Sequence, residues 1–369
     1  MQTRKTPLMH DIKEVIQMAK KILHSVPAWT LGPRAAHPKF GGGVMLSGIE
    51  KVEDRLIAIK KAWPDALTSG HTVHEIVTNV SGMEQYNSPN AIEWHNLISG
   101  IESGKFPRIA AITAPAFGYA TAHLGSILGP NKDTAYLMHL EAITRAKYLK
   151  QFGYGEGIVI WWPAFDSMMA DFAGGWPRPE FAEGWDILRD FWVHLLKNSD
   201  GTVHLEYKPN IPGARDYINT PWLAIKFCDS INLELGRKAM FINLEFAHAL
   251  IGGYYVEEAM DMILDAELYD GFAHPNSAEK ADVSYDYEGF VTSGTPGDDA
   301  DWPVGVGIDS PEKTWSDQAG AVYSMLNAPL DKDYIIMEHD VDPAGRNPIE
   351  VLGLSITNLN KMAEEAIAN

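Results

Sequence analysis

The feature that most constrains the fold of this chain is the alternation of short β-rich apolar runs with longer stretches of helical periodicity. Eight runs occur, at residues 26–31, 72–78, 108–113, 157–161, 202–207, 239–244, 269–273 and 334–338. Apolar residues recur with a helical spacing in residues 52–63, 132–153, 179–198, 220–236, 256–267, 312–327 and 347–366. Strands that alternate with helices form parallel sheets, and eight such units close a barrel. The sequence therefore predicts an α/β protein with a single (β/α)8 fold, the TIM barrel.

The length of the chain is compatible with this barrel alone. Its 369 residues exceed the typical barrel of about 250 residues by an amount that loops and terminal helices can supply. No repeat, low-complexity tract or linker marks a second domain. We predict one domain over residues 1–369, with an N-terminal helix, a barrel core at about 26–345 and a C-terminal helix at 347–367.

One connection is unusually long and acidic. Residues 275–311 have no helical period, are rich in Gly and Pro, and follow the seventh predicted strand. Nine acidic residues lie between Glu279 and Glu312, against the single Lys280. Long loops in compact domains are usually functional or disordered, and barrel active sites lie on the loops that follow the strands. We predict a long acidic loop at the active-site end of the barrel.

The balance of charges limits the partners of the chain. Lys and Arg number 30 and Asp and Glu number 49, so the net charge is −19. Nucleic acids and anionic membrane surfaces bind basic faces, and we predict neither as a partner. The N-terminal segment has no signal-peptide core, no apolar run reaches the roughly 20 residues of a membrane span, and the single Cys228 cannot form an internal disulfide. These features predict a soluble cytoplasmic protein.

Carboxylate and imidazole side chains gather at the ends of the fifth to eighth predicted strands. They are Glu206, Glu245, His248, His274 and Asp340, and the loop after the seventh strand adds Asp286 and Glu288. Each residue alone also fits a structural role, but their shared position after successive strands favours a metal site. Such ligands suit Mg²⁺, Mn²⁺ or Co²⁺. Because the set exceeds the needs of one ion, we predict a pair of ions that share a bridging carboxylate.

In this order and spacing the residues resemble the metal-dependent sugar isomerases of the xylose isomerase-like TIM-barrel superfamily. The resemblance rests on Glu-x-Lys-Pro at 206–209, Glu-x-x-His at 245–248, Tyr-Asp-x-Glu at 285–288 and Asp340. The family has Asp where this chain has Glu288. Xylose isomerases have Asp where this chain has His274, so the pattern is similar to the L-rhamnose isomerase branch as well. The resemblance extends to the segments AWTLG, TAPAF and IVIWW, which contain Trp29, Phe117 and Trp161.

The resemblance implies an intramolecular oxidoreductase that interconverts an unphosphorylated aldose and ketose by a metal-assisted hydride shift. It implies two divalent cations per chain (Mn²⁺, Mg²⁺ or Co²⁺) and a homo-oligomer, a dimer or a tetramer. The implied ligands of the first ion are Glu206, Glu245, His274 and Asp340. Those of the second are Glu245, His248, Asp286 and Glu288. The implied catalytic residue is Lys208, which stabilises developing negative charge on the sugar. Trp29, Phe117 and Trp161 would form apolar walls around the substrate.

Three questions stay open at this point. An epimerase on the same metal-binding barrel would move a proton instead of a hydride, and such barrels generally use one ion and a Glu on strand eight. A non-catalytic carbohydrate-binding barrel would require neither a metal ion nor a catalytic carboxylate. Either His71 or His74 could assist ring opening, but Gly70 is typical of a helix C-cap, which predicts that the second strand ends near Thr78.

Overall fold

The structure is a computed structural model, and it describes most of the chain. The described residues are 20–32, 34–35, 45–46, 48–70, 77–78, 92–113, 127–129, 132–163, 180–209, 217–278, 280, 282–285, 291–295, 301–307, 311–342 and 346–368. One large parallel sheet dominates the described part. Its strands are β1 (Lys21–Pro27), β4 (Leu67–Gly70), β7 (Ile109–Thr113), β8 (Gly155–Trp161), β9 (Val203–Leu205), β10 (Met240–Ile242), β11 (Leu244–Glu245), β12 (Phe272–His274) and β15 (Tyr334–Glu338).

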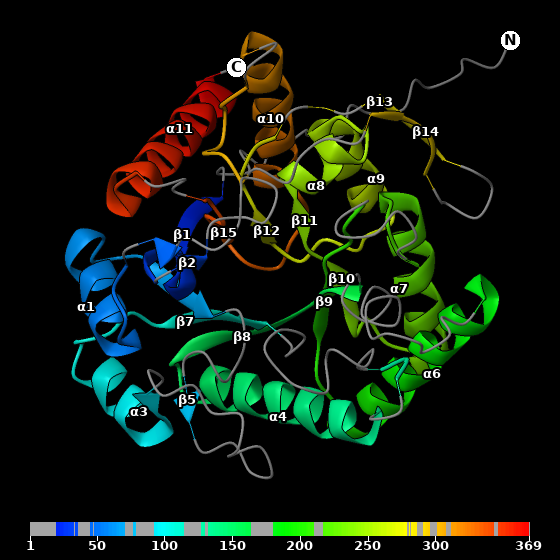
Figure 1. Cartoon of the computed structure of the whole chain (residues 1–369), viewed down its shortest axis with the longest axis horizontal. Helices are drawn as coiled ribbons and strands as arrows, with labels where there is room; N and C mark the ends of the chain where they lie inside the picture. The colour runs from blue at the N-terminus through cyan, green and yellow to red at the C-terminus, as the bar shows by residue number, and fades with distance from the viewer. Residues whose placement is uncertain are drawn as a thin grey trace, which may run out of the picture.

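This sheet closes into a barrel. The strand order is β10-β9-β8-β7-β4-β1-β15-β12-β11, and every neighbouring pair is parallel. Only Asn243 separates β10 from β11, so these two strands are successive halves of one strand, and the order begins and ends on it. Figure 1 shows the resulting ring of strands with helices around it. The predicted (β/α)8 barrel is confirmed.

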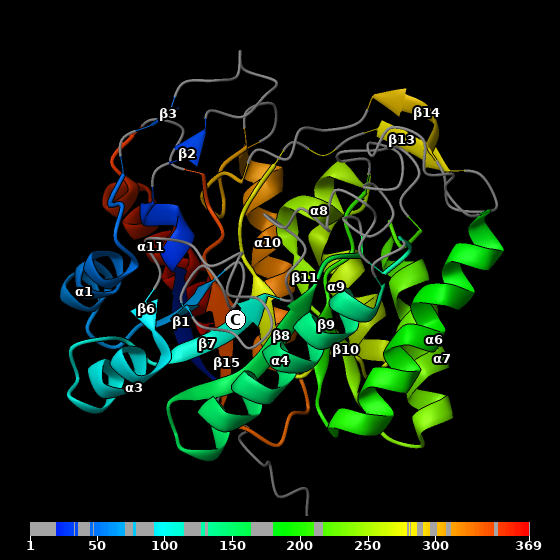
Figure 2. The same cartoon turned by 60° about the horizontal axis from the view of Figure 1, so that its bottom comes forward.

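Helices cover the outside of the barrel (Figures 1 and 2). They are α1 (Val52–Ala62), α3 (Trp94–Glu102), α4 (Lys132–Gln151), α6 (Phe181–Ser199), α7 (Pro221–Leu235), α8 (Phe246–Ile251), α9 (Val256–Asp265), α10 (Pro311–Leu326) and α11 (Pro348–Ala368). Seven of them lie where the apolar periodicity predicts a helix, and α3 and the short α8 were not predicted. Within the described residues, no helix is both long enough and apolar enough to cross a membrane.

Two predicted strands near the N-terminus are wrong in position. The first barrel strand begins at Lys21 and ends at Pro27, and a 3-10 helix, η1 (Ala28–Leu31), follows it. The second barrel strand is β4, which ends at Gly70; this glycine therefore ends a strand and does not cap a helix. Of the predicted run 72–78 the structure describes residues 77–78, which form β5 (Val77–Thr78) and pair with β6 (Ile92–Glu93) outside the barrel. The predicted N-terminal helix precedes residue 20 and lies outside the described residues.

The long connection after β12 contains more structure than the sequence predicts. It forms an antiparallel hairpin of β13 (Asp282–Tyr285) and β14 (Val291–Thr295). Figure 2 shows this hairpin at the same end of the barrel as α8. The backbones of Ser277 and Trp302 exchange hydrogen bonds of 2.8 and 2.9 Å, and this bridge closes the base of the connection. A smaller antiparallel pair, β2 (Arg34–Ala35) and β3 (Met45–Leu46), follows η1.

The side chains of each barrel strand alternate between two cores. Those that point outward pack against the helices, most of them in one large apolar cluster that includes Val203 and Leu205 of β9, and Val26 of β1 in a smaller cluster with α1 and α11. Those that point inward fill the barrel with a second apolar cluster: Leu67, Ala110, Ala111, Ile158, Ile160, Trp162, Phe272 and Ile336. Inward positions nearer the carboxyl ends of the strands carry polar groups instead. The apolar filling therefore ends where the candidate site begins.

A buried ion pair lies near the opposite, amino-terminal end of the barrel. His204 of β9 is 1% exposed, and its Nε2 lies 2.7 Å from Oδ1 of Asp270, which is 27% exposed. Burial raises the pKa of Asp270, but attraction to His204, Lys332 and Lys150 outweighs burial and lowers the pKa to about 2. A carboxyl group whose pKa is lower in the folded chain stabilises the fold above its unfolded pKa, and this stabilisation is lost as the pH falls.

We expect Asp270→Asn to lower the free energy of unfolding at pH 7 by about 1–2 kcal/mol. The difference from wild type should narrow as the pH falls from about 4 towards about 2, because the wild-type carboxylate then takes up its proton. Urea unfolding of both proteins at several pH values measures this difference. A stability gap that stays constant over that range would contradict the assignment.

Candidate metal centre

Three buried side chains converge at the carboxyl ends of neighbouring strands. Glu206 follows β9 directly, Glu245 is the last residue of β11, and His274 is the last residue of β12. Glu245 and His274 are direct partners in the β11–β12 ladder. Their exposed fractions are only 1–3%. Parallel strands bring their carboxyl ends to the same edge of a sheet, and this edge is where barrel enzymes place their active sites.

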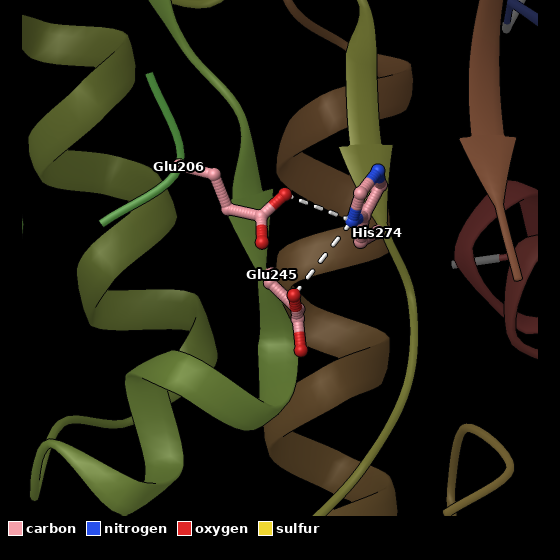
Figure 3. Close-up of side chains that lie close together, drawn as sticks. All are labelled: Glu206, Glu245 and His274. Atoms are coloured by element: carbon pink, nitrogen blue, oxygen red, sulfur yellow. Dashed lines mark ion pairs between the residues drawn. The ribbon is translucent and has the colours of Figure 1, made fainter. Parts of the chain in front are cut away.

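The distances among these three residues suit a single cation. Nδ1 of His274 lies 3.1 Å from Oε2 of Glu206 and 3.7 Å from Oε2 of Glu245 (Figure 3). One ligand atom from each residue can be chosen so that all lie within 4.8 Å of one another. One imidazole nitrogen and two carboxylate oxygens form a ligand set that divalent cations such as Mn²⁺, Co²⁺ and Zn²⁺ accept.

His248 approaches the same two carboxylates from another direction. It lies in α8, the short helix that begins immediately after Glu245. Its Nε2 is 3.2 Å from Oε1 of Glu245, and its Nδ1 is 3.7 Å from Oε1 of Glu206. Each carboxylate therefore presents one oxygen to His274 and its other oxygen to His248. The Glu-x-x-His spacing has this effect because the strand ends at Glu245 and the first turn of the helix brings His248 back over it.

The eighth barrel strand, β15, contributes a carboxylate, Glu338, that was not predicted from the sequence. Glu338 is the last residue of β15, and its Oε1 lies 3.5 Å from Nε2 of His274. Ser25 of β1 donates a hydrogen bond of 3.3 Å to its other oxygen. The predicted strand 334–338 ends at this residue, and Glu338 has the inward parity of Ile336, so the alternation could have identified it.

Asp340, the predicted strand-eight ligand, lies just beyond this position. It is 6% exposed, and its Oδ1 has no hydrogen-bond partner among the described residues. Burial raises the pKa of Asp340 well above its usual range, and repulsion by Glu245 and Glu206 adds to this effect. A buried carboxylate oxygen without a partner is costly unless a proton or a cation compensates it.

The charges of the cluster fit a bound cation. Burial lowers the pKa of His274, but Glu206 and Glu338 outweigh burial and raise it well above its usual range. Burial likewise raises the pKa of Glu206, yet attraction to His274 and His248 lowers it overall. The pKa of Glu338 is raised, mainly by burial. Four buried carboxyl groups thus surround two imidazoles, and a divalent cation would offset the excess of negative charge.

Two buried asparagines hold the glutamates in place. Asn243, between β10 and β11, donates a hydrogen bond of 2.6 Å to Oε2 of Glu206. Asn276, two residues after His274, donates one of 2.8 Å to Oε1 of Glu245. Both asparagines are 0% exposed. Groups that orient metal ligands in this way are a regular part of metal sites. An isolated Asn carries no signal in the sequence, so neither residue was predicted.

The remaining predicted site residues divide into three groups. Lys208 and Trp29 are described and half-buried. Trp161 is fully buried, with its ring centroid 4.9 Å from that of Trp192 in α6 and 5.5 Å from that of Phe227 in α7, so it faces the helices. Its neighbour Trp162 belongs to the cluster inside the barrel. Phe117, Asp286, Glu288, His71 and His74 lie outside the described residues.

Comparison with solved structures places this arrangement in a known fold. The structure of L-ribulose 3-epimerase matches with a TM-score of 0.52 at 14% identity, covering 95% of this chain and 96% of that one. A xylose isomerase domain protein from Planctomyces limnophilus matches with a TM-score of 0.52 at 11% identity, covering 95% and 100%. The chain has the xylose isomerase-like barrel fold. The resemblance seen in the sequence is therefore confirmed for the architecture.

A third barrel of this xylose isomerase-like fold is IolI, whose structure contains a zinc atom. It matches with a TM-score of 0.51 at 13% identity, covering 93% of this chain and 99% of that one. No protein-family model and no curated protein sequence matches the chain. The likeness to these proteins is thus one of fold, and the chemistry of the present chain has to be argued from its own side chains.

Proposed function

We propose that the chain is a divalent-metal-dependent sugar isomerase that interconverts an unphosphorylated aldose and ketose by a hydride shift. Glu206, Glu245, His274 and a strand-eight carboxylate would hold one cation. Glu245, His248 and the loop residues Asp286 and Glu288 would hold a second. Bound there, Mn²⁺, Mg²⁺ or Co²⁺ would polarise the sugar carbonyl and its neighbouring hydroxyl group. The zinc in IolI and the sugar substrate named for L-ribulose 3-epimerase support a metal-dependent sugar enzyme.

One observation carries this proposal. Glu206 and Glu245 each direct one oxygen towards His274 and the other towards His248, at distances of 3.1–3.7 Å. Two cations on either side of the carboxylate pair would each meet one imidazole and share Glu245. An isolated structural ion pair has no need of two histidines around two buried carboxyl groups inside a barrel mouth. The arrangement therefore favours a two-cation centre.

Residues around the centre would bind and shield the sugar. Tyr207 is buried in the outer cluster, so the alternation of side chains directs Glu206 and Lys208 towards the inside of the barrel. The Lys208 ammonium would then stabilise negative charge that develops on a sugar oxygen. Trp29 and Trp162 would supply apolar walls that limit access of water to the migrating hydride. In this proposal, Trp162 takes the position that the sequence analysis gave to Trp161.

Glu338 favours a second candidate, a sugar epimerase on the same barrel. An epimerase removes a proton from one face of a carbon and returns a proton to the other, which requires two acid–base groups. Glu206 and Glu338 lie on either side of His274, 3.1 Å from Nδ1 and 3.5 Å from Nε2. A single cation held by Glu206, Glu245 and His274 would suffice for this reaction. The two candidates differ in the particle that moves, and that difference can be measured.

The test is incubation of the metal-replete protein with a panel of aldoses and ketoses in deuterated water. We expect aldose–ketose pairs in which the transferred position carries little deuterium, because a hydride moves directly between the two carbons. Chromatography identifies the sugars and mass spectrometry counts the deuterium. Inversion at one carbon with deuterium incorporated there would establish the epimerase instead. Absence of turnover with every sugar, by protein that contains metal, would contradict both candidates.

A further inference from the structure

Asn276 occupies an unusual position beside the candidate metal centre. Its side chain is 0% exposed and makes hydrogen bonds with three different segments. Nδ2 donates 2.8 Å to Oε1 of Glu245 and 3.1 Å to Oδ1 of Asp301, and Oδ1 accepts 2.8 Å from the backbone N–H of Ala247. Strand β11, helix α8 and the segment that returns from the long loop at Asp301 therefore meet at one carboxamide.

These partners determine the orientation of the Asn276 carboxamide. The N–H of Ala247 can only donate, so the oxygen of the amide must face it. The carboxylates of Glu245 and Asp301 accept, so both hydrogens of the amide nitrogen are used. No other residue type of this size offers one acceptor and two donors in a plane, and an Asp at this position would face two carboxylates with a third.

The hydrogen bond to Glu245 limits how its carboxylate can turn. Oε1 receives the hydrogen bond from Asn276 and lies 3.2 Å from Nε2 of His248, while Oε2 lies towards His274. Asn276 therefore keeps the Glu245 carboxylate rotated so that its two oxygens face the two histidines.

The other hydrogen bond of the Asn276 amide nitrogen reaches the base of the long loop. The acceptor is Oδ1 of Asp301, and the backbone oxygen of the same residue accepts a hydrogen bond of 2.8 Å from the backbone N–H of Asp342, beyond β15. Gln318 of α10 is 0% exposed and donates to the backbone oxygen of Asn276, at 3.1 Å, and to Oγ of Ser277, at 3.0 Å. The backbone of Asn276 is thus held by a helix, and its side chain spans from the metal centre to the loop.

From these contacts we infer that Asn276 is a positioning residue that holds Glu245 for cation binding and couples it to Asp301. The inference rests on the proposed function only in treating Glu245 as a metal ligand. Loss of the amide removes one hydrogen bond from the Glu245 carboxylate and one from the Asp301 carboxylate. Residues that orient metal ligands typically contribute about 10–100-fold to metal affinity.

The test is titration of metal-free protein with Mn²⁺ alone, read by calorimetry and by the electron paramagnetic resonance signal of free Mn²⁺. Asn276→Leu keeps the size of the side chain and removes its hydrogen bonds, and we expect it to weaken Mn²⁺ binding by about 10–100-fold. Asn276→Ser, which is too short to bridge the same groups, should act in the same direction and serves if the leucine variant does not fold. Thermal unfolding verifies that each variant is folded.

Asn232→Leu is the matched control. Asn232 of α7 also uses its whole carboxamide, since Oδ1 accepts from Ala239 and Met240 and Nδ2 donates to the oxygen of Met240, at 2.8–2.9 Å. These contacts lie at the start of β10, at the opposite end of the barrel from Glu245, which ends β11. We expect Asn232→Leu to lower thermal stability but to leave Mn²⁺ affinity within about twofold of wild type, because it touches no ligand.

Asp301→Ala tests the coupling. Alone it should weaken Mn²⁺ binding by a smaller factor than Asn276→Leu, and the double variant should lose less affinity than the product of the two single losses. Three outcomes would overturn the inference. Asn276→Leu could bind Mn²⁺ with wild-type affinity, or it could lose no more affinity than Asn232→Leu. The affinity losses of Asn276→Leu and Asp301→Ala could also multiply exactly in the double variant. If wild-type protein binds no Mn²⁺, Mg²⁺ or Co²⁺ at all, the proposed function fails instead, so the two failures are distinguishable.

Discussion

Glu245→Gln is expected to abolish divalent-cation binding and to reduce sugar turnover by at least about 10³-fold. The substitution preserves size but replaces one carboxylate oxygen by an amide group that cannot bind a cation. It also removes the negative charge that both histidines contact, His248 at 3.2 Å and His274 at 3.7 Å. Because Glu245 is the proposed bridge, we expect the loss of both cations and not only one.

The measurement is the number of Mn²⁺ ions per chain together with the rate of sugar conversion. Wild type is expected to hold two ions, to lose activity after chelation and to regain it with Mn²⁺, Mg²⁺ or Co²⁺. The matched control is Glu267→Gln, the same chemical change at an exposed residue. Glu267 pairs with Lys238 away from the carboxyl ends of the strands, where Glu245 lies. One ion per wild-type chain would contradict the two-cation centre, and full binding by Glu245→Gln would contradict its role as a ligand.

The fold could be predicted from the sequence wherever a strand is buried on both faces by apolar side chains. The predicted runs at β7, β8 and β15 have this property, since their outer side chains pack on helices and their inner ones fill the barrel. The second strand lacks it. Its central residues, Thr68 and Ser69, are polar yet buried, and the hydroxyl group of Thr68 donates to the backbone oxygen of Val26. Hydropathy does not mark a buried strand whose central residues are polar.

Among the described residues, the sequence predicted to within two positions where carboxylate and imidazole side chains lie on the last strands of the barrel. Glu206, Glu245 and His274 were placed correctly at strand ends, because a carboxylate or imidazole directly after an apolar run is visible in sequence. At strand eight the predicted ligand was Asp340, but Glu338, two residues earlier on the same face, lies 3.5 Å from Nε2 of His274. After strand four the adjacent residues Trp161 and Trp162 differ by a single step, which exchanges the outer for the inner face. Spacing alone does not resolve this step.

Lys208→Met is expected to fold and to bind Mn²⁺ like wild type, yet to lose about 10²–10³-fold in kcat. Lys208 and Glu206 are two residues apart on an extended segment, so both side chains point to the inside of the barrel. The ammonium group gains strength as a sugar oxygen becomes negative, and interactions that strengthen in the transition state lower the barrier. Methionine has a similar length without the charge, so the substrate Kd should change little.

Exposed Lys61 on α1 is the control for this prediction. Lys61→Met makes the same change of charge away from the barrel mouth and should leave kcat, substrate Kd and Mn²⁺ binding unaltered. The measurements are steady-state kinetics with the preferred sugar, substrate titration and Mn²⁺ titration of all three proteins. A fully active Lys208→Met protein would exclude the proposed role of the ammonium group. A loss of Mn²⁺ binding in that variant would instead show that Lys208 supports the cation site, because its charge would then act before the sugar is bound.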